Sequence, residues 1–282
     1  MTTPRFGVST HLYHHQRLSR DHLVEIAAHG FEAVELFAMP THFDYRNPAA
    51  IADLQEWLAD TRLDLHAIHA PIVESLSGTR WGPSYSNASA DEAVRRAAVQ
   101  EADAALNVAR RIPADYLVVH LGRPYREAAP AGDNSRAAAA RSLEELQALV
   151  RPIGIRLALE IIPNDLSRPE ALVHLLEEEV DLPDAGLCFD FGHAHLFGDV
   201  LDAVETASGH LVTTHVHDNG GRSDDHLVPF EGTIDWHAAL TAVQKVGYEG
   251  TFMLELAARG TPRQTLERAQ TARDRFEKIL GG

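Results

Sequence analysis

The chain has 282 residues, of which 45% are apolar and 23% charged, a composition typical of a soluble globular protein. Its 25 basic and 41 acidic side chains give a net charge of −16, which weakly opposes non-specific nucleic-acid binding without excluding DNA. Cys188 is the single cysteine, so an intramolecular disulfide and a cysteine-based zinc knuckle are excluded. The N-terminal segment lacks signal-peptide features and no apolar run reaches the roughly 18 residues of a membrane helix, so we expect a cytoplasmic protein without a membrane partner.

Short apolar runs typical of β-strands alternate with longer helix-like stretches along the whole chain. Eight runs are predicted strands, at residues 5–10, 33–38, 63–70, 116–122, 156–162, 186–193, 211–218 and 251–256. Helices are predicted at 19–29, 47–61, 90–111, 134–150, 168–179, 199–207, 235–246 and 262–280. Ser19, Asp235 and the pair Thr261–Pro262 stand where helix N-caps are expected, and Ser89 resembles the start of a capping box.

Eight strand–helix units in a chain of this length are the count and size of a (β/α)₈ TIM barrel. No composition break divides the chain, so we expect residues 1–282 to form a single domain. A doubly wound open sheet is the alternative, and it is weaker because no G-x-G-x-x-G motif follows the first strand. A barrel carries its active site at the C-terminal ends of its strands, so those positions decide the function.

Six consecutive predicted strands, the third to the eighth, end in an imidazole or a carboxylate. The residues are His69, His120, Glu160, Asp190 with His193 three residues on, His215, and Glu255. The loop after the seventh strand adds His217, Asp218, Asp224, Asp225 and His226 in the stretch "HVHDNGGRSDDH". Of these, His217 and Asp218 are expected behind the ligands or at the rim, because His217 lies further out than His215. Like charges gathered at one end of a barrel would repel without a cation, so the pattern predicts a divalent metal site. The mixture of ligands favours zinc, manganese, cobalt or iron over calcium or magnesium.

The motifs at these strand ends resemble the xylose-isomerase-like TIM-barrel superfamily over nearly the whole chain. They read "HAP", "VVHLG", "LALEIIPN", "CFDFGHAH", "HVHDN", "DDH", "GTIDW" and "FMLEL". Sugar isomerases and epimerases of this superfamily bind one metal ion, and the resemblance implies Glu160, Asp190, His215 and Glu255 as its ligands. Endonuclease IV, which is similar, holds three zinc ions, and its additional ligands match His69, His120, His193, Asp224 and His226.

Three segments favour the sugar-isomerase branch. The chain opens with "FGVSTHLYHHQ" where endonuclease IV has a segment like "GAHVS", and "HVHDN" and "GTIDW" are typical of the isomerases. The favoured function is therefore a metal-dependent isomerase or epimerase of a sugar, sugar phosphate or related polyhydroxy carbonyl compound, with one zinc, manganese or cobalt ion. The alternative is a multinuclear zinc phosphodiesterase acting on abasic DNA, with up to three ions.

In the isomerase reading, Glu160 and Glu255 remove and return a proton next to a carbonyl group, through an enediolate that needs an adjacent cation. Contacts to the carbohydrate are expected from His193, His69, His120, Arg222 and Trp81, with Arg123 and Arg126 as further candidates. The three histidines of "HLYHHQ" (11–16) are expected to be polar rim residues or substrate contacts rather than a metal-binding tract. A third hypothesis, a non-catalytic metal-binding barrel, is disfavoured by the paired glutamates. The sequence leaves open whether the protein forms a homo-oligomer.

Overall fold

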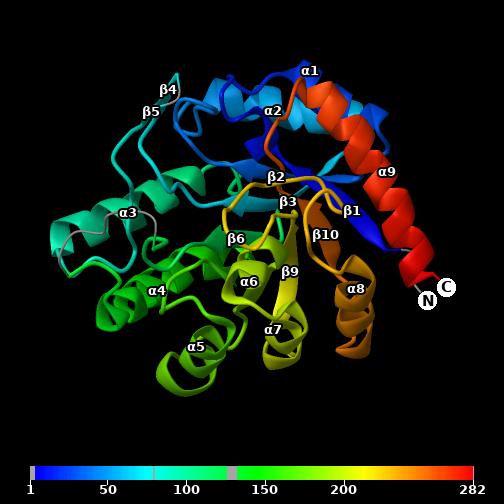
Figure 1. Cartoon of the computed structure of the whole chain (residues 1–282). Helices are drawn as coiled ribbons and strands as arrows, with labels where there is room; N and C mark the ends of the chain where they lie inside the picture. Colours follow the sequence, from blue (N-terminus) through cyan, green and yellow to red (C-terminus); the bar gives the residue numbers. More distant parts are fainter. Residues whose placement is uncertain (1–3, 79, 126–131, 282) are drawn as a thin grey trace.

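In the computed structural model, which describes residues 4–78, 80–125 and 132–281, eight parallel strands close into a barrel (Figure 1). They are β1 (Arg5–Ser9), β2 (Ala33–Phe37), β3 (Asp64–His69), β6 (Tyr116–Val119), β7 (Arg156–Glu160), β8 (Gly186–Asp190), β9 (Leu211–Val216) and β10 (Thr251–Leu254). Each strand pairs with its neighbours in chain order, and β1 closes the ring on β10. The predicted TIM barrel and its eight strands are confirmed.

Helices surround the barrel as an outer layer (Figure 1). They are α1 (Arg20–Ala28), α2 (Pro48–Thr61), α3 (Glu92–Ala105), α4 (Arg136–Val150), α5 (Pro169–His174), α6 (Phe191–Phe197), α7 (Val200–Thr206), α8 (Trp236–Lys245) and α9 (Pro262–Leu280). Short helical turns η1 (Thr10–Tyr13), η2 (Arg151–Ile153) and η3 (Leu175–Glu179) add to them. Thr261 caps α9 with Gln264 in a capping box, and Ser19 and Asp235 cap α1 and α8, as predicted.

Several details differ from the sequence prediction. The run 186–193 is a strand only to Asp190, because the Asp190 side chain accepts a hydrogen bond from the His193 backbone and so starts α6. Asp91 rather than Ser89 caps α3, with its carboxylate accepting from two backbone N–H groups. The segment after β3, where the sequence predicts neither strand nor helix, contains a small antiparallel hairpin, β4 (Leu76–Ser77) and β5 (Arg80–Trp81).

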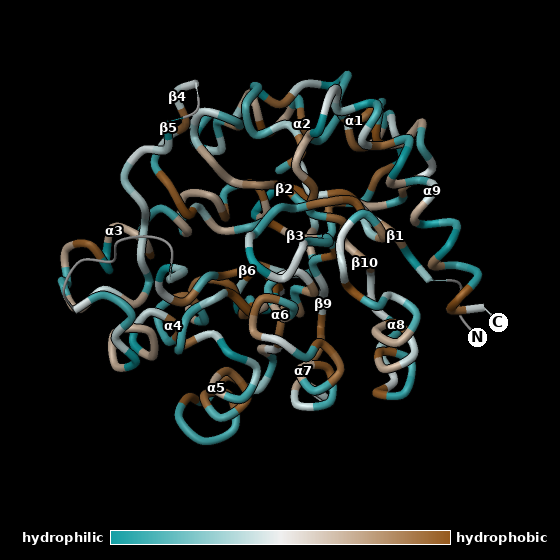
Figure 2. Tube along the Cα trace, viewed as in Figure 1, coloured by the Kyte–Doolittle hydropathy of each residue, from teal (hydrophilic) through white to brown (hydrophobic). Residues whose placement is uncertain are grey.

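The barrel wall is apolar on both faces, and hydrophobic residues recur along the central strands (Figure 2). Leu117, Leu157 and Leu187 belong to the large core between strands and helices. The residues that follow them in the chain, Val118, Ala158 and Cys188, form a separate small cluster with Ala67. Successive strand residues point to opposite faces, so this second set fills the barrel interior.

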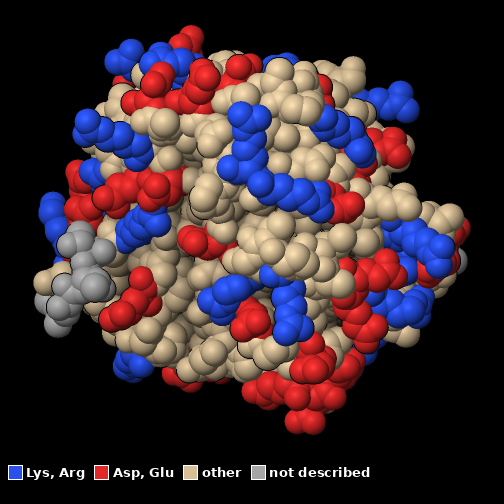
Figure 3. Space-filling model, turned by 180° about the vertical axis from the view of Figure 1, so that it is seen from behind, with Lys and Arg blue, Asp and Glu red and all other residues tan. Residues whose placement is uncertain are grey.

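Acidic and basic side chains are interspersed on the face opposite to the view of Figure 1, and acidic ones gather at its lower edge (Figure 3). This distribution agrees with the excess of acidic residues in the chain. The strand β1 and the helix α9, close to the two ends of the described chain, lie next to each other (Figure 1), with the ring centroids of Phe6 and Phe276 6.2 Å apart. Across the described residues, no helix combines the length and apolarity needed to cross a membrane.

Candidate active site

The candidate site residues continue the inward-facing rows of the barrel strands. Two positions after Ala67, Val118, Ala158 and Cys188 stand His69, His120, Glu160 and Asp190. Because side chains on a strand repeat their direction every second residue, these polar groups face the same interior one layer further along the barrel. The apolar side chains in the barrel interior therefore lie directly beneath a polar layer at the C-terminal ends of the strands.

The central group consists of Glu160, Asp190, His215 and Glu255, whose candidate ligand atoms all lie within 4.8 Å of one another. His215 Nδ1 is 3.3 Å from Glu160 Oε1, 3.5 Å from Glu255 Oε2 and 3.8 Å from Asp190 Oδ2. All four residues are buried, and neither His215 Nδ1 nor Glu160 Oε1 has a hydrogen-bond partner among the described residues. Three carboxylates and an imidazole nitrogen converging on one point are a donor set that fits a divalent ion.

The side chains of this group shift one another's pKa values. Burial disfavours the ionised carboxyl of Glu160, but the charges of His120 and His215 hold its pKa well below its usual range. Burial likewise disfavours protonation of His215, yet the carboxylates around it, including Glu35 and Glu160, raise its pKa well above its usual range. The imidazoles and carboxylates of this group therefore favour each other's charged forms.

Two further groups of potential ligands adjoin the central one. In the first, Glu160 Oε2 lies 3.1 Å from His69 Nε2 and 3.0 Å from His120 Nε2, so the two oxygens of Glu160 face different groups. In the second, Asp224 Oδ2 lies 3.2 Å from His193 Nε2 and 3.3 Å from His226 Nε2. The sequence-predicted residues are thus brought together in three groups around the end of the barrel.

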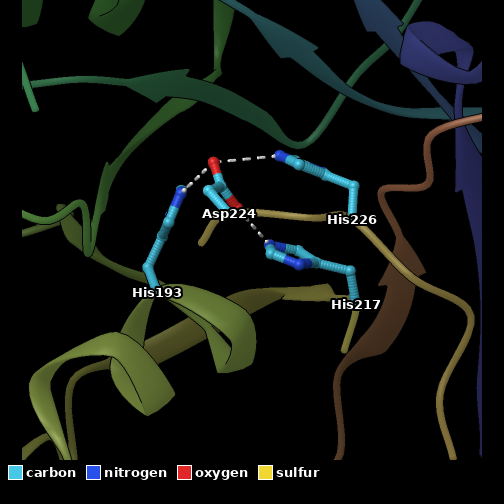
Figure 4. Close-up of side chains that lie close together, drawn as sticks. All are labelled: His193, His217, Asp224 and His226. Atoms are coloured by element: carbon cyan, nitrogen blue, oxygen red, sulfur yellow. Dashed lines mark hydrogen bonds and ion pairs between the residues drawn. The ribbon is translucent and has the colours of Figure 1, made fainter. Parts of the chain in front are cut away.

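The second of these groups includes a residue that the sequence had placed at the rim. Figure 4 shows the imidazoles of His193, His217 and His226 arranged around the Asp224 carboxylate. His217 Nε2 is 3.8 Å from Asp224 Oδ1 and 3.1 Å from Asp190. Gly192 leaves room for this ring, because a Cβ atom there would lie 2.0 Å from His217 Cε1. His217 therefore links the central group to the Asp224 group.

Each of these imidazoles is held in place by a hydrogen bond through the ring nitrogen that points away from the group. The contacts are His69 Nδ1 to Ala70 O, His193 Nδ1 to Ile161 O and His226 Nδ1 to Glu255 O, each 2.9 Å, and His215 Nε2 to Glu35 Oε2, also 2.9 Å. A backbone carbonyl can only accept, so the bonded nitrogen carries the proton and the other nitrogen faces the carboxylates. Histidines that ligate metals are typically held in this way.

Glu35 is a functional candidate that the sequence reading missed. It lies on β2, is 1% exposed, and accepts a hydrogen bond from His215. The nearby His215 charge lowers the pKa of Glu35 despite the opposing effect of burial, so its carboxylate stays ionised. The available signal was a charged residue in the middle of the apolar run "AVELFA", since a buried charge requires a partner.

We expect Glu35→Gln to weaken metal binding about 10- to 100-fold, because the amide holds the His215 tautomer less firmly than a carboxylate does. Competition between the protein and a metal-sensitive chelator dye measures this affinity. Glu32→Gln, at an exposed position just before β2, is the matched control and should bind metal like the wild type. An unchanged affinity in Glu35→Gln would show that His215 needs no such support.

The loop that carries Asp224 and His226 is organised by Asp218. The buried Asp218 carboxylate accepts hydrogen bonds from the backbone of Phe230 and Ile234 and from Trp236 Nε1, at 2.8–3.2 Å. The His226 backbone has φ = 44°, a left-handed conformation that non-glycine residues seldom adopt. Such strain persists only where surrounding contacts enforce it, and it occurs often at functional sites.

We expect Asp218→Asn to destabilise the protein by about 2–3 kcal/mol, because an amide nitrogen would face buried N–H donors that now meet a carboxylate oxygen. Thermal unfolding followed by circular dichroism measures the change. Asp235→Asn is a suitable control, since asparagine caps a helix as well as aspartate does. Equal melting temperatures for wild type and Asp218→Asn would mean that the loop is held by other contacts.

A cavity of about 520 Å³ opens over this site, within the size range of small-molecule pockets. Most predicted site residues line it, namely His69, His120, Glu160, His193, Asp224, His226, Glu255 and Trp81. Asp190 and His215 do not line it and are fully buried beneath it. Phe37, Ile72, Val73, Ile162 and Pro163 provide apolar walls.

Of the three arginines predicted to contact the substrate, one lines the cavity. Arg123 lines the cavity, but its Nε is 2.8 Å from Asp133 Oδ2 and its Nη2 donates to Ser84 O. Arg222 is exposed and does not line the cavity. Arg126 falls outside the described residues.

Fold and site together define a (β/α)₈ barrel with a buried carboxylate–imidazole cluster beneath a small-molecule cavity. Residues 23–279 match the family model for xylose isomerase-like TIM barrels, and the chain belongs to this family.

Similar proteins include isomerases and an epimerase-like protein. The chain is 24% identical to inosose isomerase of Bacillus velezensis over 89% of its length and 88% of the relative. It is 28% identical to the uncharacterized protein MJ1311 of Methanocaldococcus jannaschii, over 89% of this chain and 83% of that one. A crystal structure of a D-tagatose 3-epimerase-like protein superposes with a TM-score of 0.80 at 25% identity, covering 98% of each chain. A zinc-bound structure of IOLI protein, 18% identical, has the same fold with a TM-score of 0.77 over 97% of this chain and 98% of that one.

Proposed function

We propose that the protein is a divalent-metal-dependent isomerase or epimerase of a sugar or related polyhydroxy carbonyl compound. The observation that carries this proposal is that two of the four central residues lie beneath the cavity and the other two line it. Asp190 and His215 are covered, whereas Glu160 and Glu255 line the cavity and can meet a substrate. Two carboxylates that face one cavity are what proton removal and return require.

Each residue of the site has its own role in this reaction. Glu160, Asp190, His215 and Glu255 would hold the ion, which as a Lewis acid would favour loss of a proton next to the substrate carbonyl. Glu160, on β7, and Glu255, after β10, come from well-separated strands of the ring. One glutamate removes the proton and the other returns it, so delivery to the opposite face inverts the carbon centre. His69, His120 and His193 contact the substrate oxygens, and Trp81 packs against the apolar face of the sugar.

Solvent isotope exchange tests this function. Protein loaded with zinc, manganese or cobalt is incubated in D₂O with D-psicose, D-tagatose, D-fructose or L-ribulose. These four sugars are named in the descriptions of epimerase structures that share the barrel fold. Deuterium should appear at the carbon next to the carbonyl together with the epimer or isomer. A product formed without any deuterium, or no reaction with a wide panel of ketoses and inososes, would count against the proposal.

One observation favours a second candidate, an endonuclease-IV-like zinc phosphodiesterase. All nine positions of the three-zinc pattern, including His69, His120 and Asp224, gather around the cavity in three groups. About three zinc ions per chain by elemental analysis, with cleavage of an oligonucleotide containing an abasic site, would establish this alternative. One ion per chain would exclude it.

A further inference from the structure

The histidine tract after β1 places one more imidazole in the cavity. His11 lies in η1, directly after the strand, and its side chain lines the cavity near Glu255 and His226. It belongs to none of the three groups of potential metal ligands. Its role is therefore separate from that of the central cluster.

The faces of the His11 ring are covered by other rings. The His14 ring stacks on it with a centroid distance of 4.4 Å and an interplanar angle of 17°, and Trp81 stacks in turn on His14 at 5.4 Å and 19°. The His226 ring lies 5.0 Å away, and Phe37 meets the imidazole edge-on at 5.1 Å. This packing fixes the plane of the ring, so only its edge is available to a ligand.

One nitrogen on that edge is already used. His11 Nδ1 lies 3.3 Å from the carbonyl oxygen of Leu256, the residue after Glu255. His69, His193 and His226 are anchored to backbone carbonyls in the same way, and each turns its Nε2 toward a carboxylate. His11 Nε2 has no hydrogen-bond partner among the residues that the structure describes.

We propose that His11 is a substrate-binding residue whose Nε2 hydrogen-bonds a sugar hydroxyl beyond the reacting carbons. The anchored Nδ1 and the stack of His14 and Trp81 hold the free nitrogen in place before the sugar arrives. A preorganised polar group makes the site selective, because a sugar that lacks the matching hydroxyl leaves a desolvated nitrogen unpaired. This inference rests on the proposed isomerase or epimerase function and adds a determinant of specificity to it.

Substitutions at His11 and mono-deoxy sugars test the proposal together. The ketose that the metal-loaded wild type converts fastest, among D-psicose, D-tagatose, D-fructose and L-ribulose, is compared with counterparts that each lack one hydroxyl away from the reacting carbons. His11→Phe keeps the stacked ring and removes the nitrogen, whereas His11→Gln restores a polar atom near the position of Nε2. His237→Phe, at an exposed position on α8, is the control.

We expect the wild type to prefer the parent sugar to one deoxy counterpart by about tenfold in kcat/KM. His11→Phe should lose this factor on the parent and convert the deoxy sugar as the wild type does, and His11→Gln should recover part of the preference. A preference that persists in His11→Phe, or an equal loss on both sugars, would overturn the proposal. If the wild type converts none of the ketoses, the proposed function fails first and the role of His11 with it.

Discussion

Glu160→Gln should lower the turnover of a ketose substrate by about a thousandfold, within the usual contribution of a general acid or base. An amide cannot accept the proton, and it also replaces the carboxylate whose two oxygens face His215 on one side and His69 and His120 on the other. Initial rates with the metal-loaded protein measure the loss. Glutamine has nearly the shape of glutamate, so the barrel should keep its far-ultraviolet circular dichroism.

Glu255→Gln provides the complementary measurement, because the proposal gives each glutamate one face of the substrate. Each variant should still exchange deuterium with one of the two epimers and fail to interconvert them. Glu249→Gln, at an exposed position in the turn before β10, should match the wild type. Full turnover by either Glu160→Gln or Glu255→Gln would rule out the two-glutamate mechanism.

The sequence was sufficient to predict the barrel and the metal-ligand candidates for one physical reason. An apolar run with its polar residue at the end marks a strand whose last inward position faces the open end of the barrel. The run "LALE" shows this, because Ala158 packs in the barrel interior and Glu160 follows it two residues later on the same face. At such residues the local sequence pattern is enough to predict where the side chain lies in the folded barrel.

The contacts that position the site residues could not be predicted, because they join segments that are distant in the chain. Glu35 and His215 are 180 positions apart in the chain, and His11 and Leu256 are 245 apart. No periodicity reports such a pairing, which arises only when β1 and β10 close the ring. His217 was predicted at the rim because it follows His215 outward. Gly192, in α6, leaves room for its ring to turn inward, where Nε2 lies 3.1 Å from Asp190.

Metal loading should stabilise the wild type by about 4 kcal/mol when the free ion is about a thousandfold above its dissociation constant. At roughly 2–4 °C per kcal/mol, this corresponds to a rise of about 8 °C or more in melting temperature. The physical reason is the central group, where Glu160, Asp190 and Glu255 bring three carboxylates together in a buried layer. Differential scanning calorimetry of chelator-treated protein, with and without zinc or manganese, measures the shift.

Asp190→Asn and Asp224→Asn locate the ion that produces this stabilisation. Asparagine can still cap α6 through its side-chain oxygen, so Asp190→Asn removes a charge without removing the start of the helix. We expect it to abolish most of the metal-dependent shift, whereas Asp224→Asn, outside the central group, should retain most of it. If Asp224→Asn loses as much as Asp190→Asn, and the wild type carries about three ions per chain, the site is multinuclear and the phosphodiesterase becomes the better explanation. Otherwise Asp224 and its three histidines serve the substrate of a single-metal enzyme.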